Sequence, residues 1–251
     1  MLRRLAVLCA LGAAVALSGC AAIPEQTFIS EQPVATDALP GIITIALLEV
    51  PDPPHYYLGE GIGPATFFLG SLGAVLELST IGRDSQAYRD FSFASVTQQR
   101  LVEHLGRRGY QVTLRPLARN PAHRLVDDYR ALDLAGVDAV LDVVPVMAGF
   151  KRNPWSGPFA SEVGPHVSMV VRLVAADASR RVLYAESAQY GYDRNPLASG
   201  IKIEAPASHK FKDADAVKAN LRQAFAQLSA GIDAIARAIA AKLATRHAPP
   251  D

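Results

Sequence analysis

Cysteine is scarce in this chain of 251 residues, and its scarcity excludes several kinds of site. The two cysteines, Cys9 and Cys20, both lie near the N-terminal end of the chain. The long remainder therefore contains neither a disulfide framework nor a metal site built on cysteine thiolates. Its length is sufficient for a hydrophobic core that folds without such cross-links.

An excess of charge of either sign is also missing. The chain has 25 Lys and Arg residues and 24 Asp and Glu residues. Residues 1–19 contribute two arginines and no acidic residue, so the rest of the chain has a net charge of about −1. This balance argues against an electrostatic footprint for nucleic acid or for anionic lipid.

Residue arrangements typical of catalysis are absent as well. No Gly-x-Ser-x-Gly motif occurs, and the glycine-rich stretch 59–64 lacks the lysine of a phosphate-binding loop. The histidines show no spacing typical of metal ligands; they are His55, His104, His123, His166, His209 and His247. We therefore expect no catalytic residue, no metal and no cofactor.

The first twenty residues instead have the order of an export signal. Arg3 and Arg4 form a short positive end, and residues 5–17 form an apolar run without a charge. The run is too short to span a bilayer comfortably. Leu17-Ser18-Gly19-Cys20 follows and resembles the bacterial lipobox at each position. The resemblance implies a thioether-linked lipid on Cys20, cleavage before it, and acylation, for example with palmitate, of the new amine.

An ordinary signal peptide with a chance cysteine is the alternative. Ala21 stands where an aspartate would resemble an inner-membrane retention signal, so we expect an anchor in the outer membrane on its periplasmic face. The expected organisation is a signal peptide at 1–19, a lipidated N-terminus and flexible tether at 20–41, one periplasmic α/β domain at 42–246 and a disordered tail at 247–251.

Hydrophobic periodicity predicts an α/β fold, with α+β as an alternative. Strands are expected at 42–50, 110–114 and 137–146, with crossover helices at 91–109 and 125–136. An antiparallel hairpin is expected at 167–176 and 182–192. These elements give a mixed sheet of about five strands. The last helix, 214–244, should pack on the sheet through one apolar stripe: Leu221, Phe225, Leu228, Ile232, Ile235, Ile239 and Leu243.

Two other stretches are candidates for interaction. Residues 64–82 read as a helix with a stripe of small residues that includes Gly70, Gly73 and Glu77. This helix could fill the core, contact a membrane or a partner, or span the bilayer.

The second stretch is the loop 149–166, which carries Lys151, Arg152, Trp155 and Phe159 on an irregular backbone rich in Gly and Pro. Binding residues are often found on such loops. The alternative is that the two aromatic rings only pin the loop to the domain. A Pro/Gly loop at 51–63 is the other part of a possible ligand site.

The order of elements from 42 to 244 resembles a group of periplasmic α/β lipoproteins. These are similar to the N-terminal domain of the translocation protein TolB and to the core of the curli-secretion lipoprotein. The local matches are Gly109-Tyr110 and the stretch 136–140, Gly-Val-Asp-Ala-Val. The resemblance implies a role in envelope assembly and no catalytic residue.

We therefore expect a non-enzymatic accessory or scaffold of an envelope assembly or transport complex. Its partner would be an envelope protein or a second copy, and not a nucleic acid. A periplasmic ligand-binding lipoprotein with a site near loops 51–63 and 149–166 is the main alternative. An enzyme of unrecognised type is the third.

Overall fold

Strand β5 (Ala139–Arg152) is the centre of a mixed, eight-stranded sheet. The computed structural model describes residues 31–35, 37–60, 79–119, 125–152, 162–191 and 200–244. Along one edge, β5 pairs in parallel with β1 (Thr44–Leu48) near its start and with β2 (Tyr57–Glu60) near its end. Strand β4 (Gln111–Arg115) lies outside β1, and β3 (Ser79–Thr80) lies outside β2.

The other edge of β5 continues into the predicted hairpin. Strand β6 (Val163–Ala175) is antiparallel to β5, and β7 (Val182–Gly191) is antiparallel to β6. Strand β8 (Ile201–Glu204) then pairs in parallel with β7. The α/β class, the mixed sheet, the hairpin and the packed terminal helix are therefore confirmed.

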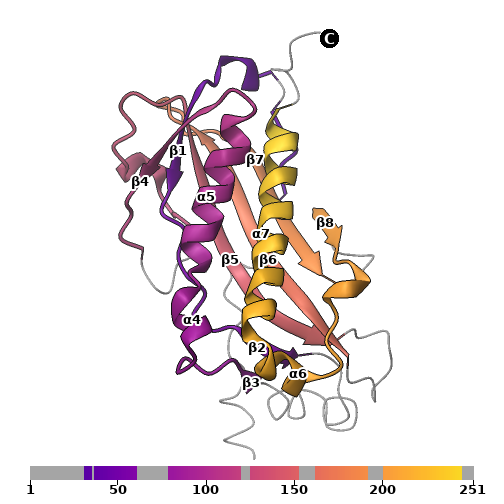
Figure 1. Cartoon of the computed structure of the whole chain (residues 1–251). Coiled ribbons are helices and arrows are strands. Elements are labelled where there is room, and N and C mark those ends of the chain that lie inside the picture. Colours follow the sequence, from indigo (N-terminus) through magenta and orange to yellow (C-terminus); the bar gives the residue numbers. More distant parts are fainter. Residues whose placement is uncertain are drawn as a thin grey trace, which may run out of the picture.

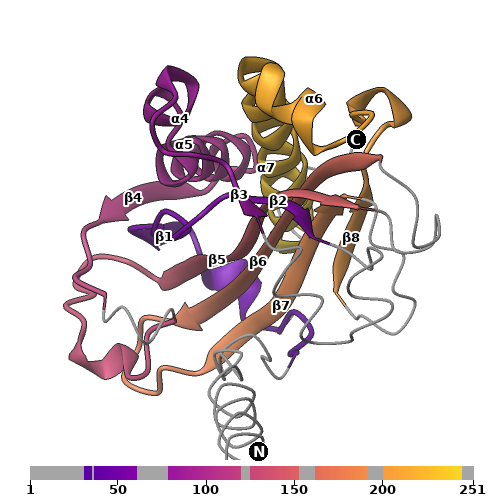
Figure 2. The same cartoon turned by 90° about the horizontal axis from the view of Figure 1, so that it is seen from below.

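Two long helices lie on one face of this sheet (Figures 1 and 2). Helix α5 (Phe93–Gly106) begins at Ser92, whose hydroxyl accepts the Ser95 N–H at 3.1 Å. Helix α7 (Leu221–Leu243) buries its apolar stripe as predicted, although Leu221 itself is only partly buried. The short helices α4 (Gln86–Asp90) and α6 (Ala214–Ala219) precede α5 and α7.

Within the described ranges, α7 is the one helix long and apolar enough to cross a membrane. Ile235 and Ile239 on its stripe have no exposed surface, so α7 is a core helix of the domain. Its last turn is held by the Tyr110 hydroxyl, which donates to the Leu243 carbonyl at 2.7 Å.

Described residues of the connection between β4 and β5 pack on part of the opposite face of the sheet. Tyr129 and Leu134 of this connection pack against Val140 and Val174. We expected a helix at 125–136, but its described helical part is the single 3-10 turn η3 (Tyr129–Ala131). This prediction was wrong because Tyr129 reaches the sheet from that turn, whereas Leu125 and Leu134 reach it from irregular backbone on either side, so no single helical face is formed.

Three short strands lie where no strand was expected. Strand β2 lies inside the predicted loop 51–63, and β8 lies inside a stretch without periodicity. Strand β3 occupies the end of the predicted helix 64–82, so that helix does not reach Gly82. Strands of this length contain too few residues to show an alternating pattern. The sheet therefore has eight strands instead of about five.

Most of the predicted helix 64–82 lies outside the described residues, but the strands on either side of this segment are described. Strands β2 and β3 are antiparallel neighbours, with Leu58 opposite Ser79. The chain therefore leaves the sheet and returns to it at the same place. Whether the segment between these two strands fills the core, contacts a membrane or a partner, or spans the bilayer stays a prediction. Residues 61–78 themselves lie outside the described residues.

Other boundaries differ from the prediction for local reasons. The predicted helix 214–244 is divided at Asn220, whose backbone (φ −129°, ψ 44°) is not helical. Strands β5 and β6 extend to Arg152 and from Val163, so part of the predicted loop 149–166 belongs to the sheet. The turn at 177–180 is where we expected it, with Arg180 at a positive φ of 48°.

Candidate functional site

The two loop regions proposed from the sequence as a binding site start from neighbouring strands. In the parallel pair of β2 and β5, Tyr57 lies opposite Gly149 and Leu58 lies opposite Phe150. Segments 61–78 and 153–161 therefore both leave the sheet at this end, which we call the β2–β5 end. The backbone pairing thus brings together two regions that are about ninety residues apart in sequence.

Gly149 permits this close pairing. A Cβ at this position would lie 2.1 Å from the carbonyl oxygen of Tyr57, so no other residue fits there without moving β2. The backbone of Gly149 has a positive φ of 153°, which also favours glycine. The sequence shows only a glycine in a predicted loop, and the function of this glycine becomes visible once its neighbour is known.

Of the interaction residues proposed from the sequence, Lys151 and Arg152 are described. Both are half-buried at the end of β5, next to Glu60 and Val163 in the strand register. The Nε atom of Arg152 is buried and has no hydrogen-bond partner among the residues that the structure describes. The remaining proposed residues lie outside the described ranges: Cys20, Gly70, Gly73, Glu77, Trp155 and Phe159.

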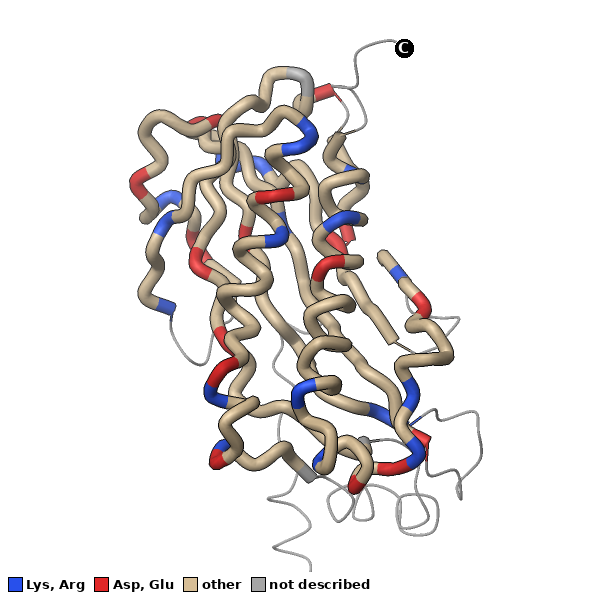
Figure 3. The backbone as a smooth tube through the Cα atoms, viewed as in Figure 1, with Lys and Arg blue, Asp and Glu red and all other residues tan. Residues whose placement is uncertain are grey.

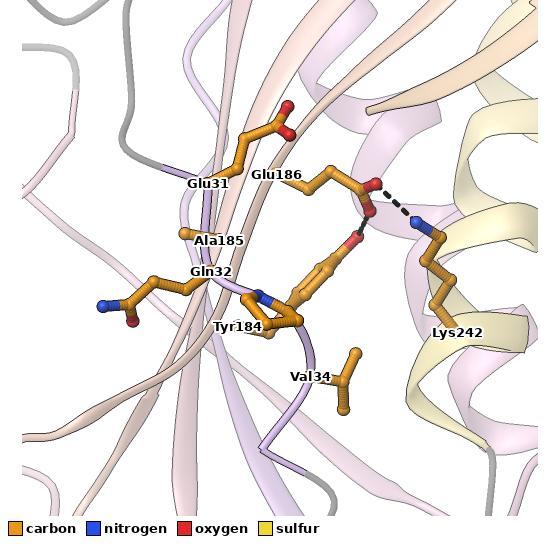
Figure 4. A pocket seen from close by; sticks show the side chains of 8 residues that line it. Glu31, Gln32, Val34, Tyr184, Ala185, Glu186 and Lys242 are labelled. Carbon is orange, nitrogen blue, oxygen red and sulfur yellow. Dashed lines mark hydrogen bonds and ion pairs between the residues drawn. The ribbon is translucent and has the colours of Figure 1, made fainter. Parts of the chain in front are cut away.

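A cavity of about 700 Å³ opens on a different side of the domain, between β7, α7 and the N-terminal segment 31–34. Glu186 of β7 lies at its centre (Figure 4). One carboxylate oxygen of Glu186 accepts from the Tyr184 hydroxyl, and the other accepts from the Lys242 ammonium group. The cavity is lined by Glu31, Gln32, Pro33, Val34, Tyr184, Ala185, Glu186 and Lys242.

These contacts define the chemistry of the cavity. Burial, together with the hydrogen bond to the carboxylate of Glu186, raises the pKa of Tyr184, so its phenol stays protonated and donates. Both oxygens of Glu186 are engaged within the protein, and the carboxylate connects β7 to the last turn of α7. This arrangement stabilises the fold, and it leaves the carboxylate poorly placed to act as a general base.

The N-terminal segment at this cavity was predicted to be a flexible tether. Instead, Gln32 and Ala185 exchange two backbone hydrogen bonds of 2.8 and 3.1 Å, and the Ala35 N–H donates to the Leu183 carbonyl at 2.8 Å. Leu39 in the 3-10 turn η2 (Leu39–Gly41) is 1% exposed. The flexible tether of 20–41 therefore does not extend to residue 41, because Gln32 and Ala35 bond to the edge of β7 and Leu39 is an apolar anchor in the domain.

A second buried carboxylate lies on the face of the sheet opposite the helices. Asp142 of β5 has no exposed surface. It accepts hydrogen bonds from the Arg119 guanidinium at 2.8 Å, the Val126 N–H at 3.0 Å and the Tyr129 hydroxyl at 2.9 Å. Arg119 also donates to the Glu49 carbonyl at 2.8 Å. This network holds the β4–β5 connection on the sheet.

Sequence reasoning missed both buried carboxylates. Their signal was an acidic residue inside an apolar strand: Asp142 in Val-Leu-Asp-Val-Val, and Glu186 in the middle of β7. The partners Arg119 and Lys242 are distant in sequence, so no local spacing reveals them. In the described part of the chain, no group of three or more His, Cys, Asp or Glu side chains is placed to hold a metal ion.

A scan of protein-family models and a search of curated proteins give no match for this chain. The fold and the contacts above define an α/β domain with a mixed sheet and a buried terminal helix. The likeness to periplasmic α/β lipoproteins stays a prediction.

Proposed function

We propose that this protein is a lipid-anchored envelope protein, held on the periplasmic face of the outer membrane through Cys20. The observation that supports the proposal is the order of the first twenty residues: two arginines, an uncharged apolar run, and Leu17-Ser18-Gly19-Cys20. Lipidation at a lipobox cysteine attaches more than one acyl chain, and stable anchoring needs at least two.

We further propose that the domain serves as a non-enzymatic accessory or scaffold of an envelope assembly or transport complex. In the described residues, the buried carboxylates of Asp142 and Glu186 use their hydrogen-bonding capacity within the fold. Acidic and basic positions are interspersed along the described chain (Figure 3), which offers no broad field of one sign for nucleic acid. The partner is an envelope protein or a second copy.

The anchor is tested by labelling cells with a radioactive or clickable fatty acid. The wild-type protein should take up label and fractionate with the outer membrane. Cys20→Ser should lose the label and leave unprocessed or soluble protein. Cys9→Ser is the matched control, because it removes the other cysteine and should keep full labelling. Unlabelled wild-type protein in the soluble periplasmic fraction would contradict the proposal.

The scaffold role is tested by crosslinking in intact cells, followed by mass spectrometry of the captured proteins. The residues predicted from the sequence to contact a partner are Trp155, Phe159, Lys151 and Arg152, and a second set is Gly70, Gly73 and Glu77. Photo-crosslinkers placed at residues 155 and 73 should capture an envelope protein or a second copy. If neither position captures a protein while other positions on the domain do, the interaction site lies elsewhere and these candidate contacts are wrong.

The second candidate function is ligand binding at the β2–β5 end. The parallel pairing of Tyr57 with Gly149 favours it, because the two segments that follow these strands then begin side by side. Trp155 is the single tryptophan of the chain, so its fluorescence reports on this region alone. A saturable fluorescence change with an added small molecule, lost in Trp155→Phe, together with a raised melting temperature in both proteins, would support this function.

A further inference from the structure

Strand β4 forms one edge of the sheet. Among the described strands it pairs with β1 alone and lies at the edge of the sheet (Figure 2). Four of its five residues are exposed. Leu114 on this strand is 53% exposed. The other large apolar side chain exposed to this degree in the described ranges is Ile43, which directly precedes β1 beside β4. An exposed edge strand with apolar side chains is a template for the addition of another strand.

The β1–β4 pairing fixes which backbone groups of β4 point outward. The Gln111 N–H donates to the Ile43 carbonyl at 2.8 Å, and the Arg115 carbonyl accepts the Glu49 N–H at 2.9 Å. Successive residues of a strand direct their backbone groups to opposite sides, so the intervening residue that also points inward is Thr113. Val112 and Leu114 therefore direct their N–H and C=O groups to the outer edge.

We propose that β4 pairs antiparallel with β4 of a second copy of this chain, with the two Thr113 residues opposite each other. This register sets Val112 of each copy opposite Leu114 of the other. These are the residues whose backbone groups point outward, so each such pair can exchange two hydrogen bonds. The same register sets Gln111 opposite Arg115, and no like charges face each other.

The side chains support the same register. Val112 and Leu114 lie beside Ile45 and Leu47 of β1, which are buried under the helices. Residues directly opposite in a sheet share a face, so both Val–Leu pairs would extend this apolar row on the helix side. A shift of two residues in one direction would instead set Val112 opposite Pro116, which has no N–H to donate.

A five-residue edge is small for a stable complex. Interfaces that persist in dilute solution bury about 1,200–2,000 Å² in total, and one short strand pair falls below this range. Two copies anchored in one membrane have a much higher effective concentration than free copies. The strength of the pairing therefore rests on the proposed anchor, whereas its register depends only on the folded domain.

The test is disulfide crosslinking of the full chain in envelope membranes. Thr113→Cys should give a disulfide-linked dimer on mild oxidation, because opposite residues of a non-hydrogen-bonded pair have Cα atoms about 4.5 Å apart. Gln111→Cys and Arg115→Cys each lie four residues from their own symmetry mate, about 13 Å, and should not crosslink alone. Co-expression of these two variants should restore the crosslink.

Backbone variants provide the second measurement. Leu114→Pro removes an outward N–H that the β1–β4 pair does not use, so it should abolish the Thr113→Cys crosslink while leaving the melting temperature nearly unchanged. Thr113→Pro removes an inward N–H of the ladder and should lower the melting temperature. Crosslinking of Thr113→Cys no stronger than in wild type, or a product joined to a different protein, would overturn the proposal. Fatty-acid labelling of the same membranes separates this failure from loss of the anchor.

Discussion

Gly231 of α7 lies directly against the ring of Tyr190 on β7. A Cβ built on Gly231 would be 2.5 Å from Cδ1 of that ring and 2.9 Å from Cε1. The ring has little room to move, because Tyr190 is 3% exposed and its hydroxyl is hydrogen bonded to His209 Nδ1 at 2.9 Å. The glycine therefore sets how closely the terminal helix approaches the hairpin.

Gly231→Ala should destabilise the domain, since overpacking of a core contact costs about 1–3 kcal/mol. Gly106→Ala in α5 is the control, because nothing lies within 4 Å of its Cβ position and alanine is the better helix former. The free energy of unfolding in urea should fall for the first variant and stay equal or rise for the second. A tolerated Gly231→Ala would mean that the helix can shift on the sheet.

The buried stripe of α7 predicts the result of a second pair of variants. Ile235→Asp places a carboxylate where no surface is exposed, and should cost several kcal/mol or make the protein insoluble. Ala226→Asp introduces the same side chain on the exposed side of the same helix and should cost less than about 1 kcal/mol. Thermal melts of the two variants make the comparison. Equal stability would show that α7 does not pack through Ile235.

Asp142 should be needed for its charge as well as its shape. Asp142→Asn keeps the size of the side chain but leaves the largely buried Arg119 guanidinium without its counter-ion, and breaking a buried pair costs up to about 3–5 kcal/mol. Asp215→Asn, at a side chain that is 87% exposed, should change stability by less than about 0.5 kcal/mol. Urea unfolding of both variants tests this. An unchanged free energy of unfolding for Asp142→Asn would mean that the ion pair with Arg119 does not stabilise the fold.

The long, periodic elements were predictable from the sequence because burial of one face imposes a repeating pattern. Helices α5 and α7 and strands β1, β5, β6 and β7 all follow from such patterns. Strands β2, β3 and β8 did not, since their identity depends on the strand they pair with. Gly149 illustrates the difference: it indicated a loop, yet it is the residue that lets β2 lie against β5.

The candidate sites were less predictable than the fold. A ligand site near loops 51–63 and 149–166 was the alternative prediction and stays one, although the pairing of β2 with β5 brings the bases of these loops together. The cavity at Glu186 was not expected, because a charged residue in a strand is ordinarily assigned to the solvent face. Its partners, Tyr184 and Lys242, come from β7 and α7, and only the folded chain joins them.

The pH dependence of stability should depend in part on Asp138. Hydrogen bonds from the backbone N–H of Thr44, the N–H of Ile43 and the Thr44 hydroxyl hold the pKa of Asp138 below its ordinary value of 3.8. A carboxyl whose pKa is lower in the folded state stabilises the fold above its unfolded pKa, and this contribution is lost as the pH falls below that value.

Unfolding free energies at pH 7 and at about pH 3 should therefore differ less for Asp138→Asn than for the wild type. The variant should also be the less stable of the two at pH 7, because one amide oxygen cannot replace the charged acceptor of three donors. An identical pH dependence for both proteins would mean that other carboxyl groups, such as Asp233 beside His104 and Arg237, account for the acid sensitivity.

Leu39 distinguishes a tether from a folded edge. In a flexible tether this side chain would be solvated, and Leu39→Ala would leave stability unchanged. In the structure Leu39 is 1% exposed within the core beneath the helices, so its truncation should cost about 2–5 kcal/mol. Leu114→Ala makes the same change at a side chain that is 53% exposed and should cost less than about 1 kcal/mol. Urea unfolding compares the two variants. The protein is kept dilute so that pairing of two copies through β4 does not contribute to the stability of either variant. Equal costs would return residues 31–41 to the tether and lengthen the reach of the anchored domain.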